Sequence, residues 1–382
     1  MARSTVVAVL VFVLSAPSVL SPPQSSAAEL QFLQPPTGYS VGKVSLGEGN
    51  IAFALAPDPA DARFIYAAGL FDFESRIVRL GLRTSSQTVV CNCPSTVSVG
   101  GFAVYTTDTM FVSDSWNHQL LVLRDRNADG DFDDAGEIER LIEPILTDLP
   151  SGWTGNAVAI VWSAANRLGL PAGTVLFQSE DGGTTGGEVL AVVDPLTSPV
   201  YQPAGGAFFA GFNYGGGIAV DARGRLVVGS SFYPDPGKVW FGEDLSGDGA
   251  IGPDESSILV DDLAAGGTGK GLSGLAVGAD NRAFACVNDT VSSQPVVRIQ
   301  TLRIPWNFHR GLSPVETFGI LNAGYVSSII FNGAKSFAPA AIDGATMVIA
   351  ASGPPPNYEN YDYLLTLTPN GPLRVRQWQQ YE

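Results

Sequence analysis

The sequence predicts an all-β fold, a six-bladed β-propeller of four-stranded antiparallel blades. The first observation is a repeat, in which short apolar segments separated by turns recur six times at intervals of 51 to 61 residues. Periods of about 40 to 55 residues built from short strands are typical of propellers. The second observation is that no window shows a sustained helical period, and the nearest candidate, at 141–143, runs into Pro144. Each repeat therefore predicts one blade.

Two repeats carry the pattern most clearly. One begins at Gly100-Gly101 and continues through apolar segments at 102–104, 110–114 and 120–123. The other begins at Gly216-Gly217 and repeats the same order of segments. Both are β-meanders, because their apolar segments are short and turn residues separate them. The first strands of the six repeats are expected around Ala52, Ala103, Val158, Ala219, Ala276 and Ile330.

Residues 1–28 predict an export signal. Arg3 supplies a positive charge ahead of an apolar run from Thr5 to Leu14, and small residues at 26–28 suit cleavage before Glu29. An uncleaved membrane anchor is the alternative, but this run is shorter than the ~20 apolar residues that a crossing needs. No later segment approaches that length. We therefore expect a secreted or periplasmic protein that is not inserted in a membrane.

The remaining chain divides into two parts. Residues 29–45 are expected to supply an outer strand to the last blade, and residues 46–382 to form the propeller. Closing the ring removes exposed sheet edges, so a propeller needs no polar cap at each end.

Composition and charge limit the possible partners. Hydrophobic residues make up 45% and charged residues 15%, so the chain can bury a large core. The formal net charge of -16 repels phosphate backbones and anionic lipid headgroups. Nucleic acid and membrane surfaces are therefore excluded as expected partners, and a cation is favoured.

One hairpin carries a family resemblance. Residues 111–123 read as a strand, Asp114, a tight turn with Asn117 and His118, and a second strand. Asp and Asn suit such a turn because their side chains bond to nearby backbone amides. The segment resembles the NHL repeat, and the resemblance implies a propeller blade in which His118 is a turn residue.

An acidic loop at 125–137, which we call the first loop, follows the third strand of its repeat. Oxygen-bearing side chains at positions 1, 3 and 5 with glycine at position 6 are similar to the calcium loops of EF-hands and dockerins. Position 12 is Gly136, and a glutamate follows one residue late. We therefore expect Asp133 or Asp134 to close the site, or Glu137 through an altered turn. The candidate ligands are Asp125, Asn127, Asp129, Asp131, Asp133 and Glu137.

A second acidic loop, at 244–255, fits the same pattern without an extra residue. Alternate positions direct hard oxygen donors at one ion, and Gly249 permits the sharp turn beneath it. Glu255 falls at position 12, where a bidentate carboxylate is expected. For both loops the alternative is a solvated acidic hairpin, and the sequence favours Ca²⁺ as the cofactor. The candidate ligands are the side chains of Asp244, Ser246, Asp248 and Glu255 and the carbonyl of Ala250.

A catalytic centre is weakly indicated. The segment 46–49 is similar to the opening motif of gluconolactonase-like propellers, in which the glutamate, here Glu48, binds a metal on the ring axis. Asn156 lies at a comparable position in the third repeat. The resemblance implies two further ligands, an Asn and an Asp, where this chain has Gly216-Gly217 and Ser273-Gly274. Two scattered histidines leave no plausible Ser-His-Asp set.

Three cysteines complete the inventory of reactive side chains. Cys91 and Cys93 stand two residues apart, so a strand places them on one face, and we expect a local disulfide or inert thiols. Taken together, the residues favour a secreted, calcium-binding NHL-type propeller that binds a protein or a glycan and is not an enzyme. The alternative is a calcium-dependent hydrolase or lactonase with a metal on the ring axis.

Overall fold

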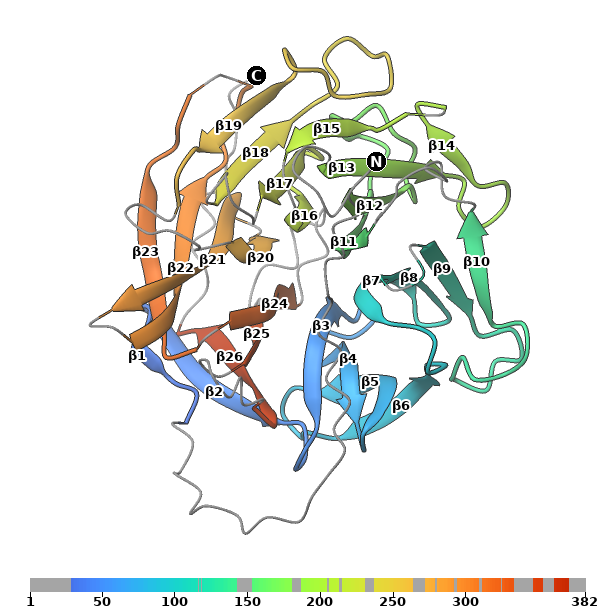
Figure 1. Ribbon diagram of the computed structural model, residues 1–382, viewed down its shortest axis with the longest axis vertical. Helices are drawn as coiled ribbons and strands as arrows, with labels where there is room; N and C mark the ends of the chain where they lie inside the picture. Colours follow the sequence, from blue (N-terminus) through green and yellow to red (C-terminus); the bar gives the residue numbers. More distant parts are fainter. Residues whose placement is uncertain are drawn as a thin grey trace, which may run out of the picture.

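The protein is a ring of six β-sheets, and no helix occurs among the described residues (Figure 1). The computed structural model describes residues 29–115, 117, 119–142, 153–180, 187–204, 206–212, 215–230, 237–263, 272–278, 280–291, 294–308, 311–323, 325–332, 346–352 and 361–370. The predicted six-bladed propeller is confirmed. The proposed export signal at 1–28 lies outside the described residues. In the described part of the chain, no helix has the length and apolar character that crossing a bilayer requires.

Three blades consist of four antiparallel strands that follow one another along the chain. Blade one contains β3 (Ile51–Pro57), β4 (Phe64–Phe71), β5 (Glu74–Gly81) and β6 (Gln87–Asn92). Blade two contains β7 (Val99–Thr106), β8 (Thr109–Asp114), β9 (Gln119–Arg124) and β10 (Ile138–Ile142). Blade four contains β16 (Gly215–Val220), β17 (Leu226–Ser230), β18 (Lys238–Gly242) and β19 (Ser256–Val260).

The other blades depart from this plan in their outer strands. Blade three contains β11 (Trp153–Ile160), β12 (Val175–Glu180), β13 (Gly187–Val193) and β14 (Val200–Gln202), with β15 (Phe209–Phe212) also paired to β13. Blade five contains β20 (Leu272–Val277), β21 (Arg282–Val291), β22 (Gln294–Arg303) and β23 (Val315–Leu321). Blade six contains β24 (Tyr325–Asn332), β25 (Thr346–Ser352) and β26 (Tyr363–Pro369).

The N-terminal segment completes two blades. β2 (Tyr39–Ser45) pairs antiparallel with β26 and is the outermost strand of blade six, the place expected for residues 29–45. β1 (Phe32–Gln34) instead pairs with β23 as a fifth strand of blade five. The ring closes where blade six meets blade one. Between their innermost strands, Ser328 Oγ accepts a hydrogen bond from Leu55 N at 3.1 Å.

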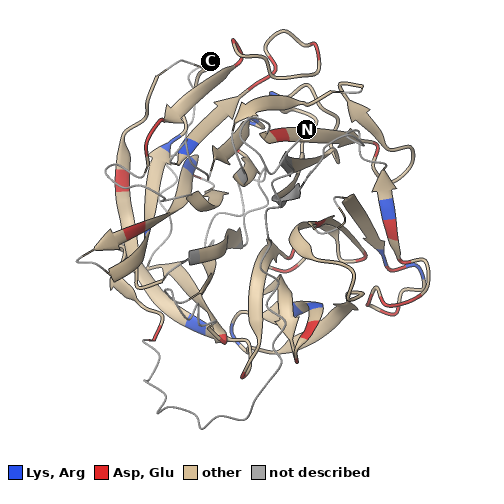
Figure 2. Cartoon of the chain, in the orientation of Figure 1, with Lys and Arg blue, Asp and Glu red and all other residues tan. Residues whose placement is uncertain are grey.

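The innermost strands are β3, β7, β11, β16, β20 and β24, and each contains one of the six repeat positions. None of these strands contains a charged residue. Charged residues lie mainly on the outer strands and in the connecting loops (Figure 2).

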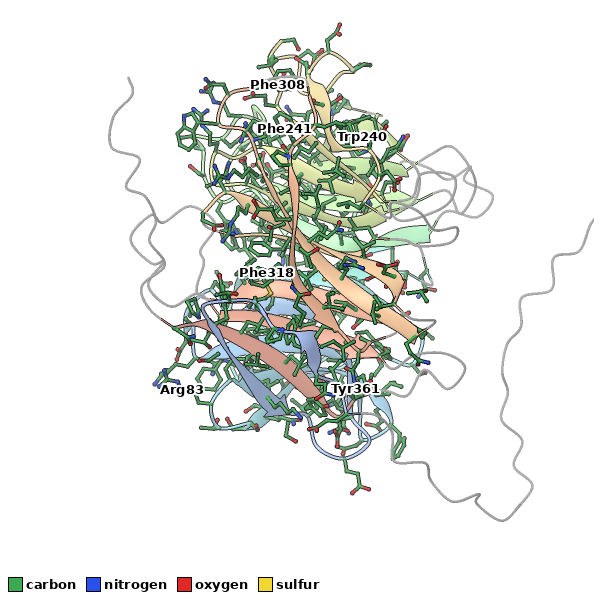
Figure 3. All side chains as sticks on the ribbon, turned by 90° about the vertical axis from the view of Figure 1, so that its left-hand side faces the viewer. Arg83, Trp240, Phe241, Phe308, Phe318 and Tyr361 are labelled. Atoms are coloured by element: carbon green, nitrogen blue, oxygen red, sulfur yellow. The ribbon has the colours of Figure 1, made fainter. Side chains whose placement is uncertain are left out.

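The core consists of six apolar clusters, one between each pair of adjacent blades. Because every blade is packed between two others, its strands are buried on both faces, as in β8, where all six residues are buried. Figure 3 shows side chains filling the space between blades; Phe241 of blade four and Phe308, which follows blade five's β22, have ring centroids 5.4 Å apart.

The hairpin from β8 to β9 has the turn chemistry that its sequence predicts. The Asp114 carboxylate is buried and accepts hydrogen bonds from Ser98 N at 3.1 Å and from Asn117 Nδ2 at 2.6 Å. Trp116 and His118 lie outside the described residues.

The Cys91 and Cys93 thiols are free, with their sulfur atoms 3.3 Å apart. Cys91 is buried, and the adjacent Cys93 thiol together with burial raises its pKa. The structure therefore has thiols here and no local disulfide.

Candidate metal sites

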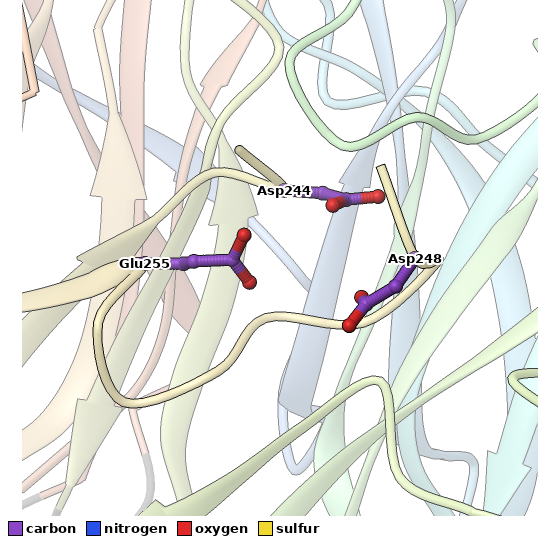
Figure 4. Close-up of side chains that lie close together, drawn as sticks. All are labelled: Asp244, Asp248 and Glu255. Atoms are coloured by element: carbon purple, nitrogen blue, oxygen red, sulfur yellow. The ribbon is translucent and has the colours of Figure 1, made fainter. Parts of the chain in front are cut away.

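The second loop connects β18 to β19 at the outer side of blade four. It brings one carboxylate oxygen each of Asp244, Asp248 and Glu255 to within 4.8 Å of one another. These three side chains point toward a common centre (Figure 4). Of the described residues, no other group of three acidic, histidine or cysteine side chains is as close. This group is the strongest candidate metal site in the described part of the chain.

Backbone amides of the loop hold its carboxylates in place. Asp244 Oδ1 accepts a hydrogen bond from Gly247 N at 2.6 Å, and its Oδ2 accepts one from Gly249 N at 3.1 Å. Asp248 Oδ1 accepts a hydrogen bond from Ala250 N at 3.1 Å. The turn that makes this possible has Gly247 and Gly249 at φ of 74° and 84°, in the left-handed region that glycine favours.

Glu255 is the most buried of the three carboxylates, with 8% of its surface exposed. Its Oε2 accepts a hydrogen bond from Gly252 N at 2.8 Å, and its Oε1 accepts from Leu245 N at 2.9 Å and Ser246 N at 2.6 Å. The Gly252 amide, with those of Ser246 and Leu245, holds the pKa of Glu255 below its ordinary value. Glu255 is therefore ionised at neutral pH beside two further aspartates.

Ser246 also faces this group, since its Oγ lies 3.4 Å from Asp244 Oδ1. Carboxylate and hydroxyl oxygens are hard donors, and calcium takes six to eight oxygen ligands. The three carboxylates repel one another, and a cation relieves that repulsion. The side-chain donors that the sequence predicts are thus compatible with calcium, and the contribution of the Ala250 carbonyl stays a prediction.

The first loop, between β9 and β10, repeats this hydrogen-bonding scheme. Asp125 Oδ2 accepts from Gly130 N at 2.9 Å, as Asp244 does from Gly249. Asn127 Oδ1 accepts from Asp129 N at 3.0 Å, and Asp129 Oδ1 from Asp131 N at 3.2 Å. Asp125 Oδ1 is buried and accepts no hydrogen bond from the described residues. This oxygen is available to a cation.

Glu137 occupies the place in the first loop that Glu255 has in the second. It is 2% exposed, its Oε1 accepts from Arg126 N at 2.7 Å, and its Oε2 accepts from Asp134 N at 3.2 Å. Its carbonyl accepts from Arg124 N at 2.8 Å, as that of Glu255 accepts from Glu243 N at 3.1 Å. The extra residue is taken up in the turn before it, where Gly136 has a φ of 89°.

Of the three residues expected to close the first site, this geometry favours Glu137 over Asp133 and Asp134. Asp133 turns to the neighbouring blade, where its Oδ1 accepts from Asn92 N at 2.6 Å and its Oδ2 from Asn92 Nδ2 at 2.5 Å. Asp134 Oδ2 accepts from Asn127 Nδ2 at 2.5 Å. The sequence does contain the relevant signal, because Glu137 directly precedes β10 as Glu255 directly precedes β19.

The axial candidates are only partly covered by the described residues. Glu48 is exposed in the connection before β3, and the Asn156 side chain lies outside the described residues. Ser273 Oγ lies 3.4 Å from Asn288 Oδ1 within its own blade. Each innermost strand has a β-bulge against the next strand. The bulge is at Phe53 in β3, Gly100 in β7, Gly216 in β16, Ser273 in β20 and Ser327 in β24. In β11 it lies within 155–157.

No family model matches this chain, and no curated protein matches it. Among solved structures, a calcium-binding protein, regucalcin, from Agrobacterium tumefaciens superposes with a TM-score of 0.53 at 13% identity, over 88% of this chain and 96% of the other. A gluconolactonase from Xanthomonas campestris superposes with a TM-score of 0.52 at 11% identity, over 90% of this chain and 96% of the other. At these identities the likeness is one of fold, and the chain is a β-propeller of the same general architecture.

Proposed function

We propose that this chain is an exported, calcium-binding propeller of NHL type that acts as a binding module for a protein or a glycan. The observation that carries the calcium assignment is the convergence of Asp244, Asp248 and Glu255 in a loop with EF-hand-like spacing. The regucalcin neighbour is described as a calcium-binding protein, which agrees with this choice of ion. A net charge of -16 further favours a cation.

Calorimetric titration of the mature protein with calcium tests the assignment. We expect Asp248→Asn to weaken binding at the second loop about tenfold or more, because it removes a charged donor. Asp254→Asn is the matched control, since it removes the same charge from the same loop at a position outside the predicted ligand set. Calcium binding that both substitutions affect equally would reflect loop charge alone and would contradict the assignment.

The binding role is supported by the chemistry of the ring axis. The six innermost strands contain no charged residue, so they offer no acid, base or metal-binding carboxylate of their own. Propellers commonly present loops on one ring face to a ligand, and this analogy is one of fold. A glycan array probed with the labelled mature protein, with calcium and with chelator, tests the glycan form of the proposal.

A calcium-dependent lactonase is the second candidate. It is favoured by the gluconolactonase neighbour and by Glu48, which lies in the connection that leads into the first innermost strand. A panel of lactones and esters assayed with and without chelator decides between the two. The control variant is Glu316→Gln, at an exposed position of β23. If chelator and Glu48→Gln each abolish turnover and Glu316→Gln leaves it unchanged, the protein is an enzyme and the binding-module proposal is wrong.

A further inference from the structure

Both acidic loops reach back to the preceding blade through the residue at their eighth position. This residue is Phe132 in the first loop and Ile251 in the second, with exposures of 1% and 6%. In the first loop it lies between the candidate ligands Asp129 and Glu137. In the second loop it lies between Asp248 and Glu255. A side chain of a polar loop that is buried between two blades requires a structural explanation.

Phe132 joins blade two to blade one. Its backbone N–H donates a hydrogen bond to Val90 O, in β6, at 2.8 Å. Its ring belongs to the apolar cluster between the two blades, together with Val90, Cys91 and Phe102. The next residue, Asp133, adds the two hydrogen bonds from Asn92 at the end of β6. Three consecutive residues of β6 are thus contacted by two consecutive residues of the first loop.

Ile251 joins blade four to blade three in the same way. Its N–H donates a hydrogen bond to Phe208 O at 2.7 Å, and it pairs in parallel with Phe209 at the start of β15. Its side chain lies in the apolar cluster between these blades, with Phe208 and Phe212. The first residue of the loop adds a second backbone contact, since Asp244 N donates to Arg167 O at 2.9 Å.

We propose that the two loops are calcium-dependent clasps that fasten blade two to blade one and blade four to blade three. This inference rests on the proposed calcium binding. Candidate ligands precede and follow the eighth residue in the sequence. An ion that binds them at one site therefore also holds the segment between them, which contains Phe132 or Ile251. Without the ion, the repulsion between those carboxylates acts on the same segment and loosens its contact with the preceding blade.

The coupling is reciprocal. If calcium strengthens the contact with the preceding blade by some factor, the contact strengthens calcium binding by the same factor. A substitution at Phe132, which offers no oxygen ligand from its side chain, should therefore weaken calcium binding at the first loop. Phe132 acts in this respect as a positioning residue.

Hydrogen exchange measures the clasp directly. In saturating calcium, amides in peptides covering 129–134 and 249–253 should be protected, and chelator should accelerate their exchange at least tenfold. Peptides from the long β21–β22 hairpin, which belongs to blade five and so to neither fastened interface, should exchange at the same rate in both conditions. If calorimetry shows calcium binding but exchange in the two loop peptides does not change, the clasp is wrong and the calcium assignment stands. If calorimetry shows no binding, both are wrong.

A pair of substitutions separates the clasp from general destabilisation. Phe132→Leu keeps the site apolar and folded, and we expect it to weaken calcium binding at the first loop about three- to tenfold. Phe102→Leu alters the same apolar cluster from β7, outside the loop and its predicted ligands, so it should leave calcium affinity unchanged. Equal losses of calcium affinity in Phe132→Leu and Phe102→Leu would overturn the proposal. Unchanged calcium affinity in Phe132→Leu and also in a separate Phe132→Ala variant would overturn it too.

Discussion

At the scale of single residues, the candidate metal sites are arranged by backbone amides. Each of the three converging carboxylates, Asp244, Asp248 and Glu255, accepts N–H bonds from the loop itself, and Glu255 accepts three. These bonds fix the oxygens before an ion arrives, so less side-chain freedom is lost on binding. The hydrogen bonds are also charge-assisted, which makes them stronger than bonds to a neutral acceptor.

The two glutamates should be equivalent in function. We expect Glu255→Gln and Glu137→Gln each to weaken calcium binding at their own loop about 10- to 100-fold, because each change removes a charged, potentially bidentate ligand. Ser246→Ala should cost less, since it removes one neutral donor. Calorimetric titration of the three variants provides the measurement. A mild effect of Glu137→Gln beside a large effect of Glu255→Gln would show that Asp133 or Asp134 closes the first site after all.

Glu255 also predicts a pH dependence in the absence of calcium. Its pKa in the folded protein is lowered, by the Gly252 amide above all, from an ordinary value of 4.5. The ionised carboxylate therefore adds stability that is fully present above about pH 4.5 and is lost as the pH falls through the lower folded-state pKa. Melting curves in chelator should show wild type losing its advantage over Glu255→Gln below that pH. A difference that is constant from pH 7 to pH 3 would contradict the shift.

At the scale of strands, the recurring feature is the bulge in each innermost strand. In blade one the bulge follows Ala52, whose partner in β4 is Gly69. A Cβ atom at Gly69 would lie 1.8 Å from Ile51 O, so only glycine leaves room for the bulged backbone. Bulges bend a strand and increase its twist, which suits the narrow centre of a ring.

Gly69→Ala should therefore destabilise the propeller by about 3 kcal/mol, since the obstructing atom belongs to the backbone and cannot rotate away. Gly206→Ala is the control, because the nearest atom to a Cβ there is Pro203 Cγ at 3.5 Å. We expect the control to remain within about 0.5 kcal/mol of wild type. Thermal melting in saturating calcium compares the two variants. Equal melting temperatures would mean that β3 can shift to accept a methyl group.

The sequence predicted the elements better than their contacts. The six repeat positions all fall in innermost strands because glycine-bounded apolar segments repeat along the chain. Both acidic loops lie where their spacing places them, between the third and fourth strands of a blade. The place of Glu137 was not evident, because ligand spacing alone does not show that Gly136 can absorb an extra residue. Contacts between a loop and the preceding blade, such as that of Phe132 with Val90, leave no periodic signal.

At the scale of the whole molecule, the blades are joined differently around the ring. Every interface contains an apolar cluster, and the interfaces between blades one and two and between three and four also contain an acidic loop. Blade six and blade five receive strands from the N-terminal segment. Apolar packing therefore stabilises every interface, and on the proposal made above a cation adds to the stability of two of them.

Calcium removal should lower the melting temperature by a small amount. Extracellular calcium modules bind with a Kd of about 10⁻⁴ to 10⁻³ M, so millimolar calcium contributes about 0.4 to 1.4 kcal/mol per site. For two sites in a chain of this size, that corresponds to a shift of about 1 to 4 °C. Differential scanning calorimetry in calcium and in chelator provides the measurement. An unchanged melting temperature would show that neither loop is occupied at millimolar calcium.

The pairing of β2 with β26 has a consequence for the order of folding. Ser40 of β2 and Asn370, which follows β26, are hydrogen-bonded across a separation of 330 residues. The strand β2 therefore has no partner in its sheet until β26 is in place. Pairings of such high contact order form slowly. In the interval, the outer edge of β26 is open to other chains. Refolding yield should therefore fall as protein concentration rises, and added peptide corresponding to residues 39–45 should raise it by covering that edge until the ring has closed.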